Sequence, residues 1–164
     1  MTILTRCLVF ALGLSFSPAL AEPLGSNGSV IDDALWNKRL LLICSESNAA
    51  LGSPLQKAQF ELVDWNGYRE RDIIIVGVSV GTSIIFDTGS FARKDANPAL
   101  HIWNDGDTKL EKKADCEGGK PSLTLIGKDS GVKAVWTNAV SNQDLFALID
   151  AMPMRAQEMR LAED

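Results

Sequence analysis

Two continuous apolar segments of strand length, residues 39–44 (Arg-Leu-Leu-Leu-Ile-Cys) and 73–78 (Ile-Ile-Ile-Val-Gly-Val), constrain the fold of this chain more than any other feature. An uninterrupted apolar run is typical of a strand that is covered on both faces. Between the two runs, Ser53 can cap a helix that begins at Pro54 and ends at Gly67. Apolar residues supply one stripe of this helix: Leu55, Ala58, Phe60, Leu62 and Val63. This order predicts a βαβ unit with two parallel strands and a right-handed crossover.

The last third of the chain predicts a β-hairpin followed by helices. Two strand-like segments, residues 122–127 and 132–136, are separated by a tight Lys-Asp-Ser-Gly turn. Ser141 then provides an N-cap with Asp144 at the third helical position, and apolar residues with helical spacing follow. A proline interrupts this helix, and residues 154–162 are expected to form a second short one.

The segment between these two units, residues 81–119, shows no clear periodicity. Short strands are expected at residues 83–86 and 100–103, and a short helix at residues 108–114. An irregular stretch of this length usually forms a functional loop or an insertion.

The elements therefore follow the order β-α-β, a variable middle, and β-hairpin-α. A parallel unit followed by an antiparallel hairpin and a closing helix is the thioredoxin-like order, so we predict an α/β fold whose mixed central sheet has helices on both faces. Pro121 precedes the hairpin directly, at a place where thioredoxin-like folds commonly have a cis-proline. Because only the bond before a proline adopts the cis form at low cost, Pro121 is the cis-proline candidate.

The N-terminal residues 1–21 have the three parts of a secretory signal peptide. A leader with one positive charge, Arg6, precedes an apolar run, and Ala19-Leu20-Ala21 supplies the small residues that signal peptidase requires. The apolar run has about ten residues, whereas a membrane-spanning helix needs roughly twenty. We therefore expect cleavage after Ala21, a periplasmic protein with no stable membrane insertion, a flexible tail at residues 22–30 and one domain at residues 31–162.

The chain is acidic, with a formal charge of −5 at pH 7. The signal segment contains one basic residue and no acid, so its removal changes this charge to −6. Because lysine and arginine form no cluster in the sequence, the balance argues against nucleic acid as a partner. The partners that we expect are another envelope protein or a small ligand.

Three stretches, residues 36–43, residues 125–133 and residues 145–160, together resemble the bacterial domain of unknown function DUF4174. That domain is similar to the C-terminal thioredoxin/peroxiredoxin-like domains of some animal extracellular-matrix proteins. The resemblance spans roughly residues 31–160, and it implies a fold and an exported setting but no established activity and no catalytic residue. The chain departs from the family in a longer segment before the hairpin and in the presence of Cys116 there.

Cleavage of the signal peptide leaves two cysteines, Cys44 and Cys116. A pair of cysteines in an oxidising compartment usually bonds where the geometry allows it. In the expected fold the end of the first strand lies near Pro121, and Cys116 is five residues before this proline. A bond would close a loop of about 72 residues and stabilise the fold by roughly 4 kcal/mol in the chain-entropy account. A structural disulfide is the default expectation, and a reactive pair or two separate thiols remain open.

The motifs that activate a thiol are missing from the sequence. A thioredoxin-type enzyme needs a cysteine at the start of the first helix, where the helix dipole lowers the thiol pKa. Residues 47–53 contain no cysteine, and no proline and threonine precede Cys44 in the peroxiredoxin arrangement. The catalytic residues are therefore unknown, with Cys44 and Cys116 as the only candidates.

Other chemistries have weaker support. His101, Asp105 and Asp107 are three possible metal ligands on an irregular segment, which is weak evidence, so we expect no metal and no cofactor. The first hypothesis is a non-catalytic periplasmic thioredoxin-like module with a binding or structural role. The alternative is a thiol redox enzyme that uses Cys44 with Cys116. The missing activating motif favours the first.

Overall fold

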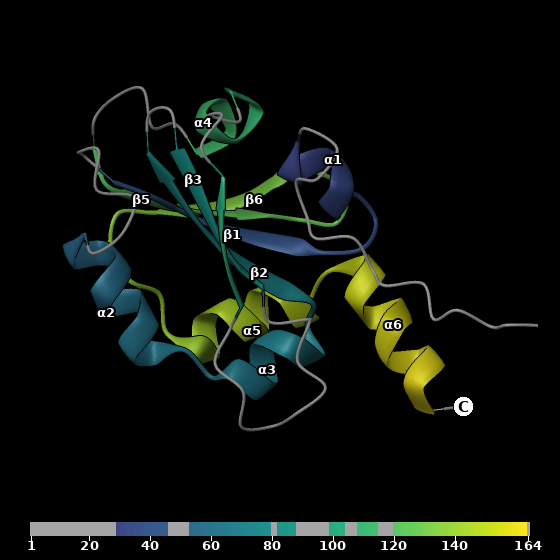
Figure 1. The fold of residues 1–164 in the computed structure, drawn as a ribbon. Coiled ribbons are helices and arrows are strands. Elements are labelled where there is room, and N and C mark those ends of the chain that lie inside the picture. The colour runs from purple at the N-terminus through teal and green to yellow at the C-terminus, as the bar shows by residue number, and fades with distance from the viewer. Residues whose placement is uncertain are drawn as a thin grey trace, which may run out of the picture.

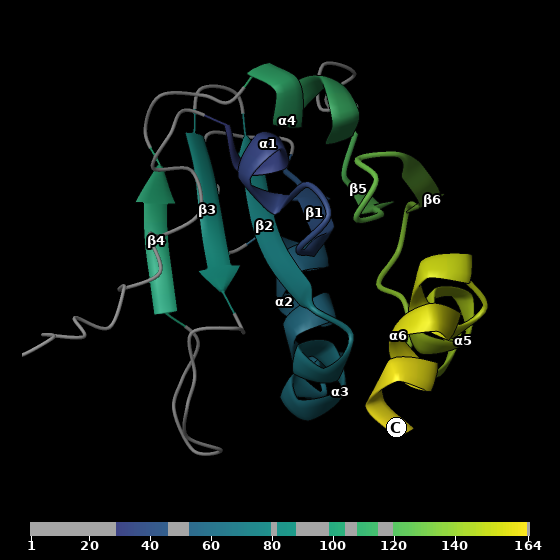
Figure 2. The ribbon, with the colours of Figure 1, turned by 90° about the vertical axis from the view of Figure 1, so that its right-hand side faces the viewer.

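A mixed sheet of six strands lies at the centre of the computed structural model, which describes residues 29–45, 53–79, 82–87, 99–103, 108–114 and 120–163. The strand order across the sheet is β4-β3-β2-β1-β5-β6 (Figure 2). The strands are β1 (Arg39–Cys44), β2 (Ile73–Ser79), β3 (Thr82–Asp87), β4 (Ala99–Trp103), β5 (Ser122–Ile126) and β6 (Val132–Trp136). The helices are α1 (Val30–Ala34), α2 (Pro54–Leu62), α3 (Trp65–Glu70), α4 (Thr108–Ala114), α5 (Asn142–Asp150) and α6 (Pro153–Glu163).

Strand β1 occupies the centre of the sheet. It pairs in parallel with β2, where Leu41 lies opposite Ile75, and antiparallel with β5, where Leu41 lies opposite Leu125. Strand β6 pairs antiparallel with β5. Every residue of β1 and β2 is buried, as the two continuous apolar runs predict. The strands β2-β1-β5-β6 therefore have the thioredoxin-like order and directions.

Helices cover both faces of this sheet, which confirms the predicted layers (Figure 1). Successive side chains of a strand point to opposite faces, and β1 divides accordingly. Leu40 and Leu42 pack in one apolar cluster with residues of α1 and α4. Leu41 and Ile43 pack in a second cluster with residues of α2, α3 and α5.

The middle of the chain contains the short elements that were expected there. Strand β3 pairs antiparallel with β2, and β4 pairs antiparallel with β3, so that the two strands extend the sheet beyond the βαβ unit. In α4, Leu110 and Ala114 are fully buried. Strands β3 and β4 therefore extend the sheet at its β2 side, while α4 packs on one face of it.

The capping residues act as predicted in α2 and α5. Ser53 Oγ accepts a hydrogen bond from the Gln56 amide at 3.1 Å, and Ser141 Oγ accepts one from the Asp144 amide at 3.1 Å. A new helix, α6, begins at Pro153. Within the described segments, no helix has both the length and the apolar character required to cross a membrane.

The predicted helix from Pro54 to Gly67 is wrong in its extent. Helix α2 ends at Leu62, and α3 begins after Asp64, whose carboxylate accepts a hydrogen bond from the Asn66 amide at 3.1 Å. Asp64 acts as a new N-cap and separates the two helices. Gly67 lies inside α3, where a Cβ atom would be 2.5 Å from the Phe146 ring. This glycine permits a close tertiary contact and does not end a helix.

The cis-proline expected at Pro121 is not found. No peptide bond within the described residues is cis, and these residues include both Lys120 and Pro121. The trans form is favoured by about 0.5–1 kcal/mol even before proline. The residue before a proline also prefers extended backbone, which suits a chain that enters β5 at Ser122.

We predict that Gly67→Ala destabilises the protein by about 1–3 kcal/mol, the usual cost of overpacking a core. Alanine normally favours a helix over glycine by about 1 kcal/mol, so a loss of stability would have the opposite sign to the helix propensity. The added methyl group would lie 2.5 Å from Phe146 and 2.8 Å from Asp64 Oδ2. Urea unfolding measures the change. In a Phe146→Leu background the cost should shrink, and an equal cost in both backgrounds would contradict the explanation.

Candidate functional site

Cys44, the first predicted site residue, ends β1 and is 1% exposed. Its partner across the sheet is Ser122 of β5, whose hydroxyl donates a hydrogen bond to the carbonyl oxygen of Ala114 at 2.9 Å. The last residue of α4 therefore lies beside the cysteine end of β1. Cys116 follows Ala114 by two residues but lies outside the described residues, so its pairing with Cys44 stays a prediction. Pro121 is half-buried beside Ser122.

The structure leaves the weak metal hypothesis untested. Asp105 and Asp107 lie outside the described residues, and His101 lies on β4, where only the backbone is described. Among the residues that the structure describes, no group of three or more histidine, cysteine, aspartate or glutamate side chains forms a candidate metal site.

The opposite end of β1 holds a set of charged side chains that we call the ion cluster: Lys38, Arg39, Asp72, Lys128 and Glu158. The Arg39 side chain is 1% exposed, and its Nη2 donates to both carboxylate oxygens of Glu158, at 3.1 and 3.3 Å. The Lys128 ammonium lies 2.7 Å from Glu158 Oε1 and 2.8 Å from Asp72 Oδ2. Because a buried charge is tolerated only when it is paired and hydrogen-bonded, Glu158 compensates Arg39 and joins α6 to β1.

Asp72 ties the start of β2 to the start of β1. It occupies the turn after α3 with a φ of 52°, in the left-handed region that aspartate tolerates better than most residues. Its carbonyl oxygen accepts a hydrogen bond from the Arg39 amide at 2.8 Å, and its carboxylate accepts one from Lys38 at 3.1 Å. Backbone and side chain of one residue thus contribute to the same junction.

Two further arginines, Arg71 and Arg155, extend the charged region towards α3 and α5. Arg71 Nη2 lies 2.6 Å from Asp150 Oδ2, and Arg155 Nε lies 3.3 Å from Asp150 Oδ1. Arg155 Nη2 also lies 2.8 Å from Glu70 Oε1. The Arg71 guanidinium stacks on Phe146, with Cζ 4.2 Å from the ring centroid. These pairs hold α3, α5 and α6 together.

The cations lower the pKa of both carboxylates of the ion cluster. Burial alone would raise the pKa of Asp72, but the hydrogen bonds from Lys128 and Lys38 outweigh it. Burial would likewise raise the pKa of Glu158, and the hydrogen bonds from Lys128 and Arg39 outweigh it. Each carboxylate therefore stays ionised at a lower pH in the folded protein than in the unfolded chain.

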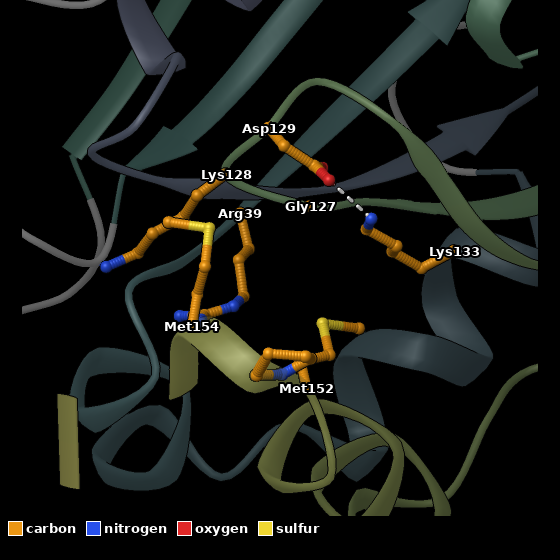
Figure 3. A pocket seen from close by; sticks show the side chains of 8 residues that line it. Arg39, Gly127, Lys128, Asp129, Lys133, Met152 and Met154 are labelled. Atoms are coloured by element: carbon orange, nitrogen blue, oxygen red, sulfur yellow. Dashed lines mark hydrogen bonds and ion pairs between the residues drawn. The ribbon is translucent and has the colours of Figure 1, made fainter. Parts of the chain in front are cut away.

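A pocket of about 280 Å³ lies beside the ion cluster, between the β5–β6 hairpin and the turn that joins α5 to α6 (Figure 3). Arg39 runs along one side of this pocket, Met152 lies at its base, and Lys133 approaches from the other side (Figure 3). Lys133 Nζ is 2.7 Å from Asp129 Oδ2. The full lining is Arg39, Gly127, Lys128, Asp129, Lys133, Met152, Pro153 and Met154.

Gly127 makes room for the side chain of Lys133. A Cβ atom at this position would collide with Lys133 Cε and would lie 2.7 Å from Asp129 Oδ1. Three cations and one carboxylate give the wall a positive part, while two methionines and a proline give it an apolar part. The arrangement can therefore offer cations and an apolar surface to the same small molecule.

Sequence reasoning missed the ion cluster and the pocket. The available signal was Arg39, a charged residue at the head of a strand whose apolar run indicates burial on both faces. Such a charge requires a partner. The partner, Glu158, is 119 residues away in the chain, and no local pattern connects the two residues.

The fold and the site define an α/β domain with thioredoxin-like strand order, an ion-paired end and a small cationic pocket. The chain belongs to the family described as Domain of unknown function (DUF4174), which it matches over residues 30–158. This match confirms the family resemblance, and it includes Arg39, Lys128 and Glu158. No curated protein and no solved structure matches the chain.

We predict that the protein loses stability as the pH falls below about 4.5, and that Glu158→Gln removes part of this dependence. The pKa values of Asp72 and Glu158 are lowered from 3.8 and 4.5, so the unfolded chain binds more protons in this range. The stabilisation is therefore complete above these values and is lost as the pH falls through the folded-state pKa values. At pH 7, Glu158→Gln should lower the free energy of unfolding by on the order of 3 kcal/mol, because Arg39 loses its counter-charge.

The matched control for this variant is Glu61→Gln on the exposed surface of α2. Urea unfolding between pH 3 and pH 8 compares the two variants with the unmodified protein. Glu61→Gln should stay within about 0.5 kcal/mol of that protein, as surface substitutions usually do. If both variants have the same effect, the ion cluster does not stabilise the fold in this way.

Proposed function

We propose that the protein is an exported, periplasmic thioredoxin-like binding module in which Cys44 forms a structural disulfide with Cys116 and performs no thiol catalysis. The observation that carries this proposal is the burial of Cys44, which is 1% exposed and packs in an apolar cluster with residues of β2, α1 and α4. A reactive cysteine needs solvent access and a group that lowers its pKa, and this buried position offers little solvent access.

The surroundings of Cys44 support the pairing. Cys44 lies opposite Ser122, and Ser122 is hydrogen-bonded to Ala114 at the end of α4. Two residues of chain reach at most about 7 Å, so covalent connectivity keeps Cys116 near Ala114. A disulfide requires Cα atoms roughly 4.4–6.8 Å apart. This distance is within reach of the short segment that follows α4.

A binding role is supported by the pocket at the other end of β1. The pocket is lined by cations, one carboxylate and thioethers, and it lies between elements that the ion cluster holds in place. A preformed concave site with a few polar groups is the usual form of a small-ligand site. The proposed binding site and the proposed disulfide therefore lie at opposite ends of β1.

We predict that the purified, non-reduced protein contains no thiol that reacts with Ellman's reagent while it is folded. Its disulfide should have a reduction potential below about −300 mV, as structural disulfides of secreted proteins do. Cys44→Ser combined with Cys116→Ser should lower the free energy of unfolding by roughly 4 kcal/mol. Thiol titration, redox equilibration and urea unfolding provide these three measurements.

The control for the thiol test is the same titration in denaturant, which should detect no thiol before reduction and two after it. Rapid modification of Cys44 in a mildly reduced but still folded protein would contradict the structural role. That result would favour the alternative, a thiol redox enzyme that uses Cys44 with Cys116.

We also predict that the mature protein begins at Glu22. Intact-mass spectrometry of protein recovered from the envelope fraction tests this, with Ala21→Arg as a variant that should block cleavage by removing the small residue. Recovery of a chain that still begins at Met1 from the unmodified protein would overturn the export proposal.

A further inference from the structure

We propose that the pocket between the β5–β6 hairpin and α6 binds a small carboxylate that has an apolar body. This inference deepens the binding role proposed above and rests on it. It does not depend on the cysteines, because the pocket is at the Arg39 end of β1 and Cys44 is at the other.

The pocket lining contains more cations than carboxylates. Arg39, Lys128 and Lys133 stand against a single carboxylate, Asp129, although the whole chain has a formal charge of −5. Glu158 and Asp72, which lie outside the lining, pair with Arg39 and Lys128. Both cations are nearly buried, so Lys133 is the cation most open to a ligand. The side chains of Lys133 and Asp129 are 30% and 40% exposed, and ion pairs of this kind contribute little to stability. The carboxylate of a ligand can therefore replace Asp129 as the partner of Lys133.

Two further features of the pocket lining concern hydrogen-bond donors. The Nε atom of Arg39 is buried and has no hydrogen-bond partner among the described residues, although the other guanidinium nitrogens are paired. Helix α6 begins at the pocket with Pro153, and the amides of Met154 and Arg155 have no acceptor inside the helix. The first turn of α6 contains no acidic residue. A helix N-terminus favours an anion, and a buried donor without a partner is costly.

The apolar part of the wall and the size of the pocket define the rest of the ligand. Met152, Pro153 and Met154 offer thioether and ring surface, and methionine adapts easily to the shape of an apolar ligand. A volume of about 280 Å³ is slightly below the usual range for ligand sites, roughly 300–1,000 Å³. A bare inorganic anion would leave the apolar wall uncovered, and a nucleotide would be too large. A medium-chain monocarboxylate can contact the cations with its carboxylate and the methionines and proline with its alkyl chain.

Octanoate is the probe for this proposal, titrated calorimetrically into the purified mature protein with its cysteines as isolated. We expect saturable binding of one octanoate per chain. Acetate lacks the apolar body and octan-1-ol lacks the charge, so each should bind at least about tenfold more weakly, because a charge-assisted hydrogen bond or the apolar contact is lost.

The variant Lys133→Met tests the assigned site, because methionine lacks the charge of lysine but has an unbranched side chain of similar length. It should weaken octanoate binding about tenfold, while Lys57→Met on the exposed face of α2 should leave the affinity unchanged. Amide chemical-shift changes on addition of octanoate should concentrate at Gly127, Lys133 and Met154. Urea unfolding of both variants confirms that each is folded.

The proposal is overturned if octanoate fails to bind, if Lys133→Met binds it like the unmodified protein, or if the shifts concentrate elsewhere. None of these results would alter the thiol measurements, which decide separately whether Cys44 has a structural role. A reactive Cys44 with intact octanoate binding would overturn the proposed structural disulfide and leave the pocket assignment standing.

Discussion

The buried guanidinium of Arg39 is the constraint on which the arrangement of the described chain depends. Arg39 is the first residue of the central strand, and its side chain is 1% exposed, so its charge requires a partner inside the protein. Glu158 supplies it from α6, and Lys128 shares the same carboxylate from the hairpin turn. Asp72, which pairs with Lys128, brings the start of β2 to the same place. A single buried charge thus determines where four separate segments meet, and it explains why α6 packs at this end of the sheet (Figure 1).

The two ends of β1 have different chemistry because different elements cover them. At the carboxyl end, Cys44 packs among apolar side chains of the α1 and α4 face. At the amino end, the charges of β1 and the hairpin meet those of α6, and every pair contains at least one side chain that is partly exposed. Thioredoxin-type thiol chemistry belongs to the first end, where the sequence lacks the motif that activates a cysteine. The ligand binding that we propose is placed at the second end, where Arg39 Nε has no acceptor among the described residues.

The elements that the sequence predicts well are those whose signals are local. The buried strands β1 and β2 follow from uninterrupted apolar runs, and the starts of α2 and α5 follow from Ser53 and Ser141. The errors arise where tertiary contacts decide. Gly67 resembles a helix end in the sequence, but it lies inside α3. The close packing of the Phe146 ring explains why this helical position is a glycine. The ion cluster could not be predicted, since Arg39 and Glu158 are 119 residues apart and only the packing of α6 brings them together.

The pocket and the ion cluster share Arg39 and Lys128, so the stability of the fold and the charge of the pocket are coupled. Glu158 compensates these two cations enough to make their burial tolerable, but its carboxylate leaves Arg39 Nε without an acceptor. The carboxylate that we propose for the pocket would meet the Lys133 ammonium and the start of α6. It would then contact the hairpin and α6, the two elements that Glu158 already joins. Because a ligand that binds only the folded state stabilises it by mass action, occupation of the pocket would strengthen the junction on which the packing of α6 depends.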